Sequence, residues 1–158
     1  MKESYKREYC ILAAIILIVF VALYKVLEIK EASMDDIEQS IVQTADITRM
    51  NKGDALKLKN LYYINKNDIE NFILYAPKTN MDANEILILK AKSEKDLEGL
   101  KTKVQGRIEK QSSSFKSYRP EEYEIINHRV LETKGQYLIL IISRESRDIK
   151  AAIDRNFK

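Results

Sequence analysis

The sequence is poor in the residues that most often carry recognisable chemistry. Its 158 residues include one cysteine, one histidine, four glycines and no tryptophan. A single cysteine excludes an intramolecular disulfide, and a lone histidine lacks the partners at defined spacing that metal sites normally use. The glycines form no phosphate-cradling loop, and no nucleophile motif such as G-x-S-x-G is present. The sequence therefore predicts no cofactor, no metal and no catalytic centre.

Net charge is also low once the N-terminal segment is set apart. The whole chain has 27 basic and 24 acidic residues, of which residues 31–158 hold 22 basic and 21 acidic residues. A domain so close to neutral does not attract nucleic acid through its overall field. The chain has no tryptophan and no aromatic residues interleaved with basic ones, so we predict no nucleic-acid partner.

The one long apolar run lies near the N-terminus. From Tyr9 to Tyr24 no residue is charged, and the apolar pattern continues beyond Lys25 to Ile29. About 20 apolar residues span a bilayer core, tyrosines favour its interfaces, and a terminal lysine can extend its ammonium group into the headgroups. A helix of a soluble core would have a polar face, which this run lacks. The sequence therefore predicts a transmembrane anchor over residues 9–29, with the lipid bilayer as its partner. The residues expected to hold the anchor in the bilayer include Tyr9, Ile15, Phe20, Tyr24 and Lys25.

A cleaved signal peptide would also begin with charge and an apolar run. Cleavage needs small residues in an A-x-A-like pattern, but Phe20 stands two places before Ala22 and Lys30 two places before Ala32. Cys10 precedes the apolar run, whereas a lipoprotein cysteine would follow it. We therefore predict an uncleaved anchor in which Cys10 is an apolar helix residue, with its acylation as the alternative.

Basic residues on either side of the run predict its orientation. Lys2, Lys6, Arg7 and the terminal amine precede the run, and Lys25 and Lys30 follow it. This excess predicts a cytoplasmic N-terminus and an extracytoplasmic domain. The predicted organisation is a cytoplasmic tail over 1–8, the anchor over 9–29, a linker over 30–33 and one domain over 34–158.

Beyond the anchor, the spacing of apolar residues predicts a mixed α+β domain. Helices are expected where apolar residues recur every three or four positions, and strands where apolar residues alternate or are continuous. The expected helices cover about 34–47, 54–62, 94–117 and the region around 149–157. The expected strands cover 69–76, 85–91, 123–133 and 136–143.

Short turns between neighbouring strands predict an antiparallel sheet. The strand at 85–91 is apolar on both faces, which predicts a central position, and Lys134-Gly135 predicts a tight hairpin with positive φ at the glycine. The clearest helical stripe consists of Leu97, Leu100, Val104, Ile108, Gln111 and Phe115. The sheet face expected to bury this stripe carries Ile86, Ile88, Val130 and Leu140. The result is a two-layer domain with a four-stranded, mainly antiparallel sheet packed on helices, in the order α-α-β-β-α-β-β-α.

Six short motifs in the domain stand in a recognisable order. They are Leu61-Tyr62-Tyr63-Ile64, Asp68-Ile69-Glu70, Ala83-Asn84-Glu85-Ile86, Tyr118-Arg119-Pro120-Glu121-Glu122-Tyr123, Lys134-Gly135-Gln136-Tyr137 and Ile141-Ile142-Ser143. Over residues 34–158 they resemble the bacterial secreted and membrane-attached domains of unknown function numbered 4358. The resemblance implies an extracytoplasmic domain of Gram-positive bacteria and carries over no catalytic residue. It also implies many lipoprotein relatives, from which this sequence departs because its anchor has no lipidatable cysteine after it.

Two carboxylate pairs and the histidine are the remaining candidates for chemistry. Asp35-Asp36 fits a helix start, where acids complement the helix dipole, and Glu121-Glu122 fits the opening of a turn or strand. The alternative for either pair is a Ca²⁺ site, which needs a third acid nearby. His128 on a strand fits a surface position.

The predicted function rests on two observations, the abundance of tyrosines and the absence of catalytic motifs. Six tyrosines are candidates for an aromatic groove that binds a peptide or glycan: Tyr62, Tyr63, Tyr75, Tyr118, Tyr123 and Tyr137. We select Tyr62, Tyr75 and Tyr123 as the binding surface, and the alternative is that the tyrosines pack the sheet edge. We predict a non-enzymatic module that binds a protein, peptide or cell-wall component at the bacterial cell surface. One alternative is a cell-envelope hydrolase or wall-modifying enzyme. The residues available to such an enzyme are Glu121, Glu122 and His128. Another alternative is a structural subunit of a larger envelope complex.

Overall fold

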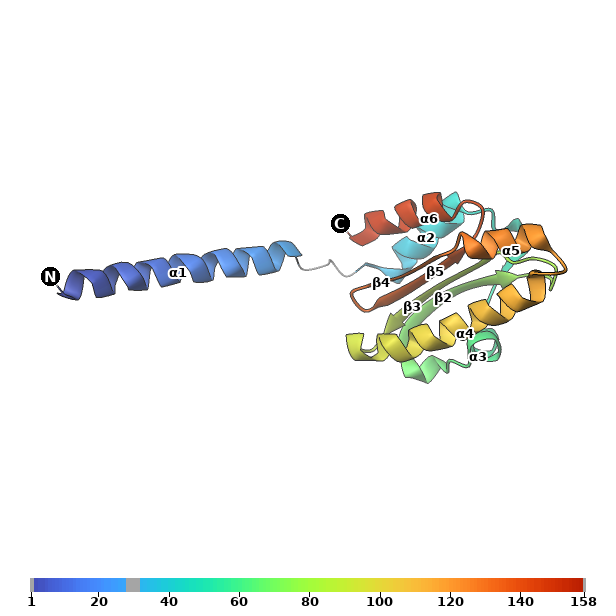
Figure 1. Ribbon diagram of the computed structural model, residues 1–158, viewed down its shortest axis with the longest axis horizontal. Helices are drawn as coiled ribbons and strands as arrows, with labels where there is room; N and C mark the ends of the chain where they lie inside the picture. Colours follow the sequence, from blue (N-terminus) through green and yellow to red (C-terminus); the bar gives the residue numbers. More distant parts are fainter. Residues whose placement is uncertain (1, 28–31, 158) are drawn as a thin grey trace. The chain divides into compact units, whose positions relative to one another are not determined.

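The computed structural model describes residues 2–27 and 32–157, with side chains for residues 9–21 and 32–157. The chain divides into two compact units, residues 1–30 and residues 31–158 (Figure 1). The first unit contains most of the predicted anchor, and the second contains the predicted domain. Each unit is described by itself.

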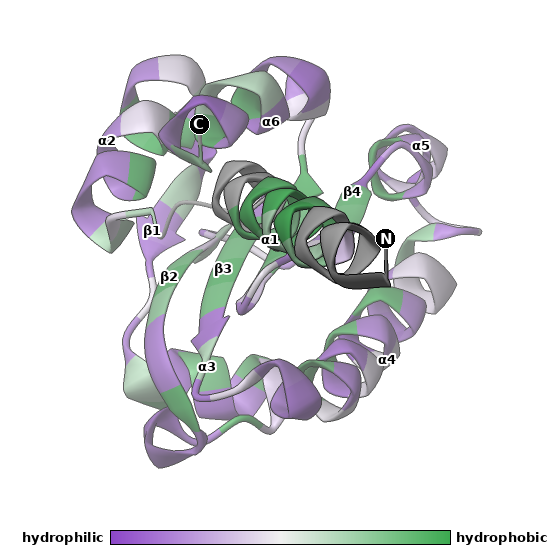
Figure 2. Cartoon of the chain, turned by 90° about the vertical axis from the view of Figure 1, so that its left-hand side faces the viewer, coloured by the Kyte–Doolittle hydropathy of each residue, from purple (hydrophilic) through white to green (hydrophobic). Residues whose placement is uncertain are grey.

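The described residues of the first unit form one helix, α1 (Lys2–Leu27). Its large apolar side chains between Tyr9 and Val21, including Ile15 and Phe20, are exposed, and Figure 2 shows this part of α1 as hydrophobic. Among the residues whose placement is described, no helix is long and apolar enough to cross a membrane. The parts of the predicted anchor and linker that lie outside the described residues are the side chains of residues 22–27, which include Tyr24 and Lys25, and residues 28–31.

The second unit is a mixed α+β domain around one antiparallel sheet of five strands. Its helices are α2 (Met34–Thr44), α3 (Ala55–Tyr62), α4 (Leu97–Phe115), α5 (Pro120–Asn127) and α6 (Ser146–Asp154). Its strands are β1 (Met50–Lys52), β2 (Ile69–Pro77), β3 (Glu85–Ala91), β4 (Val130–Lys134) and β5 (Tyr137–Ile142). Short 3₁₀ turns cover Ile47–Arg49, Lys66–Asp68, Glu94–Asp96 and Arg155–Phe157. The strands lie in the order β1-β2-β3-β5-β4, and each neighbouring pair is antiparallel.

Helices cover both faces of the sheet, so the predicted two-layer arrangement is wrong. In Figure 1, α2 and α6 lie on one side of the strands and α3 and α4 on the other. The cause is visible in β3, where all seven residues are buried and successive side chains point to opposite faces. A strand that is apolar on both faces needs helices on both faces. The predicted central position of this strand is confirmed.

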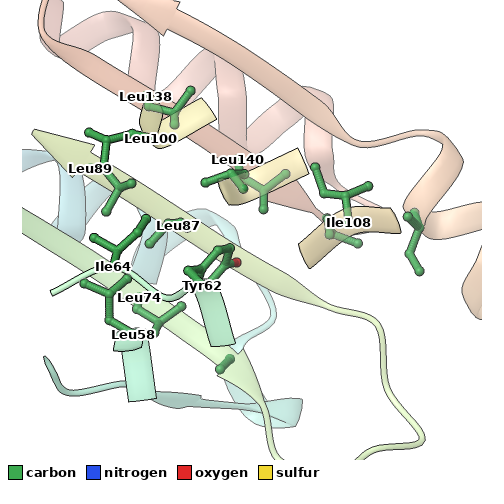
Figure 3. Packing of buried hydrophobic residues seen from close by; sticks show 14 of the residues in the cluster. Leu58, Tyr62, Ile64, Leu74, Leu87, Leu89, Leu100, Ile108, Leu138 and Leu140 are labelled. Carbon is green, nitrogen blue, oxygen red and sulfur yellow. The ribbon is translucent and has the colours of Figure 1, made fainter. Parts of the chain in front are cut away.

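The first core layer lies between the sheet and α3, α4 and α5 (Figure 3). The predicted stripe of α4 is confirmed, since its members from Leu100 to Phe115 are buried. The strand residues that contribute to this layer include Leu74, Leu87, Leu89, Leu138 and Leu140. The predicted partner face was therefore wrong except at Leu140. Strand register explains the error, because Leu87 pairs with Leu140 whereas Ile86 pairs with Ile141 on the opposite face.

The second core layer lies between the sheet and α2 and α6. The predicted apolar face of the last helix is confirmed, because Ile149, Ile153 and Phe157 are buried there. The remaining residues of this layer include Ile37, Ile41, Ile73, Tyr75, Ile86, Ile88, Tyr137, Ile139 and Ile141. Val130, which we expected beneath α4, packs against this second layer.

Two further elements correct the predicted order. The strand expected over 123–133 is helical in its first half, because Pro120 occupies the first turn of α5 and two glutamates follow it. Proline and acids both favour a helix N-terminus, a signal that overrides the apolar residues after it. The edge strand β1 pairs with the end of β2 and lies between the helices predicted over 34–47 and 54–62, where no strand was predicted, so the sheet has five strands and not four. The predicted hairpin is confirmed, with φ of 54° at Gly135.

Candidate functional site

A charged network lies inside the first core layer. Glu85, the first residue of β3, is fully buried, and the Tyr62 hydroxyl at the end of α3 donates a hydrogen bond to its carboxylate. Arg107 of α4 donates from Nη2 to Glu85 Oε2 at 2.7 Å and from Nε to Oε1 at 3.3 Å. Gln111 lies one helical turn further and donates from Nε2 to Oε2 at 3.2 Å. Three side chains from two helices therefore converge on one buried carboxylate.

The network shifts the pKa values of Tyr62 and Arg107. Burial raises the pKa of Tyr62 well above its ordinary value of 10, and the charge and hydrogen bond of Glu85 raise it further. Burial acts to lower the pKa of Arg107, but its hydrogen bonds and ion pair with Glu85 outweigh burial, and the pKa is raised. Tyr62 is therefore a neutral donor and Arg107 a permanent cation.

One atom of the network lacks a partner. The carboxylate of Glu85 accepts from the amide nitrogen of Gln111, which directs the amide oxygen Oε1 elsewhere. Oε1 is buried and has no hydrogen-bond partner among the described residues. A buried acceptor without a donor costs about 1–3 kcal/mol, so such an atom in a folded protein calls for a reason.

Arg107 and Gln111 also line a surface cavity of about 500 Å³, here called the α3–α4 cavity. Its walls come from α3, from α4 and from the loop between β2 and β3. The charged lining residues are Lys57, Lys78, Asp82, Arg107 and Lys110. The apolar and aromatic lining residues are Leu61, Pro77, Met81, Phe115 and Tyr118. The cavity thus combines a basic rim with an apolar wall. It adjoins the buried network through Arg107 and Gln111, which belong to both.

The loop between β2 and β3 is held in place by buried and half-buried charges. Arg49 forms an ion pair with Asp82, and the backbone N–H of Ala83 donates to Glu122 Oε2 at 2.7 Å. Glu122 Oε1 also lies 3.8 Å from Arg49 Nη2 and 3.7 Å from Arg119 Nη2. Glu122 therefore positions a wall of the α3–α4 cavity.

The other two residues of the hydrolase hypothesis lie elsewhere. Glu121 and His128 line a shallow groove of about 490 Å³ together with Ser143. His128 Nδ1 is 2.8 Å from the carbonyl oxygen of Glu124, and the Ser143 hydroxyl donates to Glu145 at 2.6 Å. The three predicted residues are therefore not brought together. Among the described residues, no group of three His, Cys, Asp or Glu side chains could hold a metal ion.

The three tyrosines of the predicted aromatic surface do not share one surface. Tyr62 is fully buried in the first core layer, and Tyr75 is buried in the second layer on the opposite face of the sheet. Tyr123 is half-buried against the first layer. The exposed tyrosine that lines the α3–α4 cavity is Tyr118. The pair Asp35-Asp36 is exposed in the first turn of α2, as a helix start requires.

Sequence analysis missed most of this site, although two signals pointed to it. Gln111 interrupts an apolar stripe, and Glu85 opens a strand that is otherwise almost wholly apolar. A polar side chain at a core position needs a partner, and Arg107 stands one helical turn before Gln111. The basic lysines of the rim carry no such signal, because lysines are spread along most of the chain.

The fold and this site together define a mixed α+β domain, helical on both faces of its sheet, with a basic cavity over a buried ion pair. The family model described as Domain of unknown function (DUF4358) matches residues 43–143, and the chain belongs to that family. The match includes every residue named above for the α3–α4 cavity and its supporting loop. No curated protein and no solved structure matches the chain.

Proposed function

We propose that the chain is a membrane-anchored module whose extracytoplasmic domain binds a ligand in the α3–α4 cavity without transforming it. The observation that carries the binding role is the cavity itself, which joins a preorganised polar base to an apolar wall. Ligand pockets are typically concave and mostly apolar, with a few polar groups held in fixed positions. Preorganised groups bind more tightly because little conformational entropy remains to be lost.

The protonation states at the base of the cavity support binding over catalysis. The Glu85 carboxylate already accepts hydrogen bonds from three side chains of the protein, so its oxygens are largely occupied. Arg107 does not exchange protons at ordinary pH, and the raised pKa of Tyr62 disfavours its phenolate. These groups are suited to hold and orient a ligand.

The hydrolase alternative now depends on Glu121 and His128 alone, since Glu122 positions the β2–β3 loop. The groove shared with Ser143 is the observation in its favour. Against it, the Ser143 hydroxyl donates to Glu145, whereas nucleophilic catalysis needs a serine in hydrogen-bond reach of its base. Turnover of a chromogenic ester that His128→Ala abolishes would support this alternative.

The proposed anchor is supported by the uncharged run from Tyr9 to Tyr24 and by the exposed apolar side chains of α1. Three basic residues precede the run and two follow it, which supports an outward domain. We expect protease added to intact protoplasts to digest residues 31–158. Mass spectrometry of the membrane protein should find the apolar run still attached. Protection of the domain until lysis would contradict the orientation, and a mature N-terminus near residue 25 or 33 would contradict the anchor.

The binding role is tested by blocking the cavity. Ser114 lines the cavity and is exposed, so Ser114→Trp places a large ring in it; Ser113→Trp adds the same ring to a neighbouring exposed position that does not line the cavity. We expect small aromatic probes to perturb the NMR signals of cavity residues in the full chain in nonionic detergent. Ser114→Trp should abolish the perturbation and Ser113→Trp should preserve it. Probes that perturb both variants equally, or none, would contradict the proposed site.

A further inference from the structure

We infer that the α3–α4 cavity selects anionic ligands, in which a carboxylate or phosphate group is attached to a small apolar or aromatic body. The inference rests on the proposed binding role of the cavity and adds the chemical class of its occupant. Three features of the lining carry it: unbalanced positive charge, an apolar wall and one unpaired acceptor.

The lining carries four basic residues against one acidic residue. The positive charge of Arg107 is balanced by Glu85. The negative charge of Asp82 is balanced by Arg49, so Asp82 does not neutralise the lysines of the lining. The remaining lysines are Lys57, Lys78 and Lys110.

These three lysines keep their charge available to a ligand. Within residues 32–157, the ammonium groups of Lys57 and Lys110 have no carboxylate within ion-pair distance. Lys78 donates to the carbonyl oxygen of Thr48 at 2.6 Å, a contact that leaves its charge intact. Like charges gathered around a concave, low-dielectric surface focus the field and concentrate ligands of opposite sign.

The apolar wall suits a ligand with an aromatic or aliphatic body. Tyr118 is 74% exposed and Met81 is 38% exposed, so both offer apolar surface at the mouth of the cavity. Phe115 and Leu61 continue this wall toward the base. A volume of about 500 Å³ falls in the range of pockets that hold small organic ligands. A bare inorganic anion would leave the apolar wall uncovered.

The unpaired Oε1 of Gln111 adds a preference for a hydrogen-bond donor. Gln111 lines the cavity, and this oxygen has no donor among the described residues. An amide N–H or hydroxyl on the ligand, close to its anionic group, would supply the missing donor once it displaces the covering side chains. A polar group that would otherwise stay unpaired discriminates strongly between ligands with and without the matching partner.

The experiment measures the affinity of the full chain in nonionic detergent for matched aromatic probes by calorimetry. The anionic probes are hippurate, which combines a carboxylate with an amide N–H, and phenyl phosphate. The other probes are neutral benzyl alcohol, cationic benzylamine and inorganic phosphate. We expect both aromatic anions to bind more tightly than all three others, with an affinity that falls as salt rises. Tighter binding of hippurate identifies a carboxylate ligand, and tighter binding of phenyl phosphate identifies a phosphate ligand.

Charge reversal on α3 supplies the matched control. Lys57 lines the cavity, whereas Lys59 is exposed two residues further along the same helix and does not line it. We expect Lys57→Glu and Lys110→Glu each to weaken binding of the aromatic anions at least tenfold, and Lys59→Glu to change it less than twofold. All three positions are exposed, so the variants should melt like the parent.

The outcomes separate the two claims. Equal or tighter binding of benzyl alcohol or benzylamine, blocked by Ser114→Trp, would overturn the anionic class and leave the binding role standing. The same follows if Lys57→Glu and Lys59→Glu have equal effects on the aromatic anions. Failure of every probe to bind in a manner sensitive to Ser114→Trp would overturn both claims.

Discussion

The two faces of the sheet use charge differently. On the face covered by α2 and α6, Lys134 and Asp154 form an ion pair at the rim, with both side chains about a quarter exposed, and the buried cation Lys90 pairs with Glu70, whose side chain is 51% exposed. On the face covered by α3, α4 and α5, the side chain of Glu85 is fully buried and that of Arg107 is 13% exposed. Rim pairs stay solvated and contribute little, whereas a buried pair gives up hydration that apolar residues of the same size do not need.

The stability of the fold alone does not explain why Glu85 and Arg107 are buried. The α2/α6 layer consists of isoleucines, alanines, two tyrosines, a methionine and a phenylalanine, and among the described residues no fully buried carboxylate lies on this face of the sheet. The buried carboxylate on the other face lies beside the α3–α4 cavity and meets it through Arg107 and Gln111. This position agrees with the proposed ligand-binding role of the α3–α4 cavity, and variants on the two faces distinguish that role from a purely structural one.

The largest effect is expected from a charge placed in the core beneath α4. Val104 is fully buried in the first core layer, and Val104→Asp would leave a carboxylate there without a partner. An unpaired buried charge costs several kcal/mol, comparable with a whole domain's stability of about 5–15 kcal/mol. We expect Val104→Asp to abolish the cooperative transition in urea. Lys103→Ala, at an exposed neighbour, should change the free energy of unfolding by no more than about 0.5 kcal/mol. A Val104→Asp variant that unfolds like the parent would disprove the packing of α4 on the sheet.

The next largest effect is expected when an ion pair is broken, and its size should differ between the two faces of the sheet. Arg107→Met leaves the Glu85 carboxylate buried without its cation and should lower the free energy of unfolding by about 3–5 kcal/mol. Lys52→Met removes the exposed cation that pairs with Glu38 of α2 and should cost at most about 1 kcal/mol. Urea unfolding of both variants measures the two costs side by side.

A double variant sharpens this comparison. Adding Glu85→Leu to Arg107→Met removes the unpaired carboxylate, so the double variant should be more stable than Arg107→Met alone. Its affinity for the aromatic anions should nevertheless remain low, because the base of the cavity has lost its polar groups. Equal stability of the single and double variants in urea unfolding would show that the pair is not the source of the difference between the faces.

A smaller effect is expected where β1 meets β2. Gly53 donates its N–H to the carbonyl of Leu74 at 2.8 Å, and a Cβ at Gly53 would lie 2.6 Å from Leu74 Cδ2. Leu74 is fully buried in the first core layer, so Gly53→Ala should cost about 1–3 kcal/mol through overpacking. A Cβ at Gly99 on α4 would enter open space, and Gly99→Ala should stabilise the helix by about 0.5–1 kcal/mol. Thermal unfolding curves should therefore shift in opposite directions for the two variants.

The fold was predictable where periodicity extends over many residues. The stripe of α4 and the apolar run of β3 each provide enough positions to distinguish a helix from a strand. The three residues of β1 are too few to show alternation, and α5 was assigned as a strand because Tyr123 and Ile125 alternate with glutamates. The predicted number of layers was wrong, although the two apolar faces of β3 already indicated that each face needs a covering helix.

The site was less predictable because its contacts join distant parts of the chain. Glu85 and Arg107 are 22 positions apart, and Ala83 and Glu122 are 39 positions apart. Their pairing depends on how α4 and α5 cross the sheet, which local spacing does not specify. Glu85 and Gln111 were nevertheless visible as polar residues at core positions. The sequence signal for such a site is therefore a polar residue that breaks an apolar pattern, followed by a search for its partner.

The smallest effect concerns the rim of the α2/α6 face and depends on pH. Burial acts to raise the pKa of Asp154, but hydrogen bonds from Lys134 and Lys150 outweigh it, and the pKa lies below its ordinary value of 3.8. A carboxyl group with a lowered pKa in the folded state contributes stability above its unfolded pKa and loses it as pH falls through the folded pKa. The contribution should therefore be complete at pH 7 and be lost as pH falls below 3.8 and through the lowered pKa of the folded state.

Asp154→Asn tests this window by urea unfolding at pH 7 and at a series of acidic pH values below 3.8. Because the pair is partly exposed, we expect the variant to lose at most about 1 kcal/mol at pH 7 and to match the parent in acid. Glu109→Gln is the control, since Glu109 is exposed on α4 and pairs with no cation among the described residues, and it should match the parent at all of these pH values. A deficit in Asp154→Asn that persists unchanged in acid would mean that the shape or hydrogen bonding of the side chain matters rather than its charge. The rim charges would then differ from the buried pair of Glu85 and Arg107 in kind as well as in size.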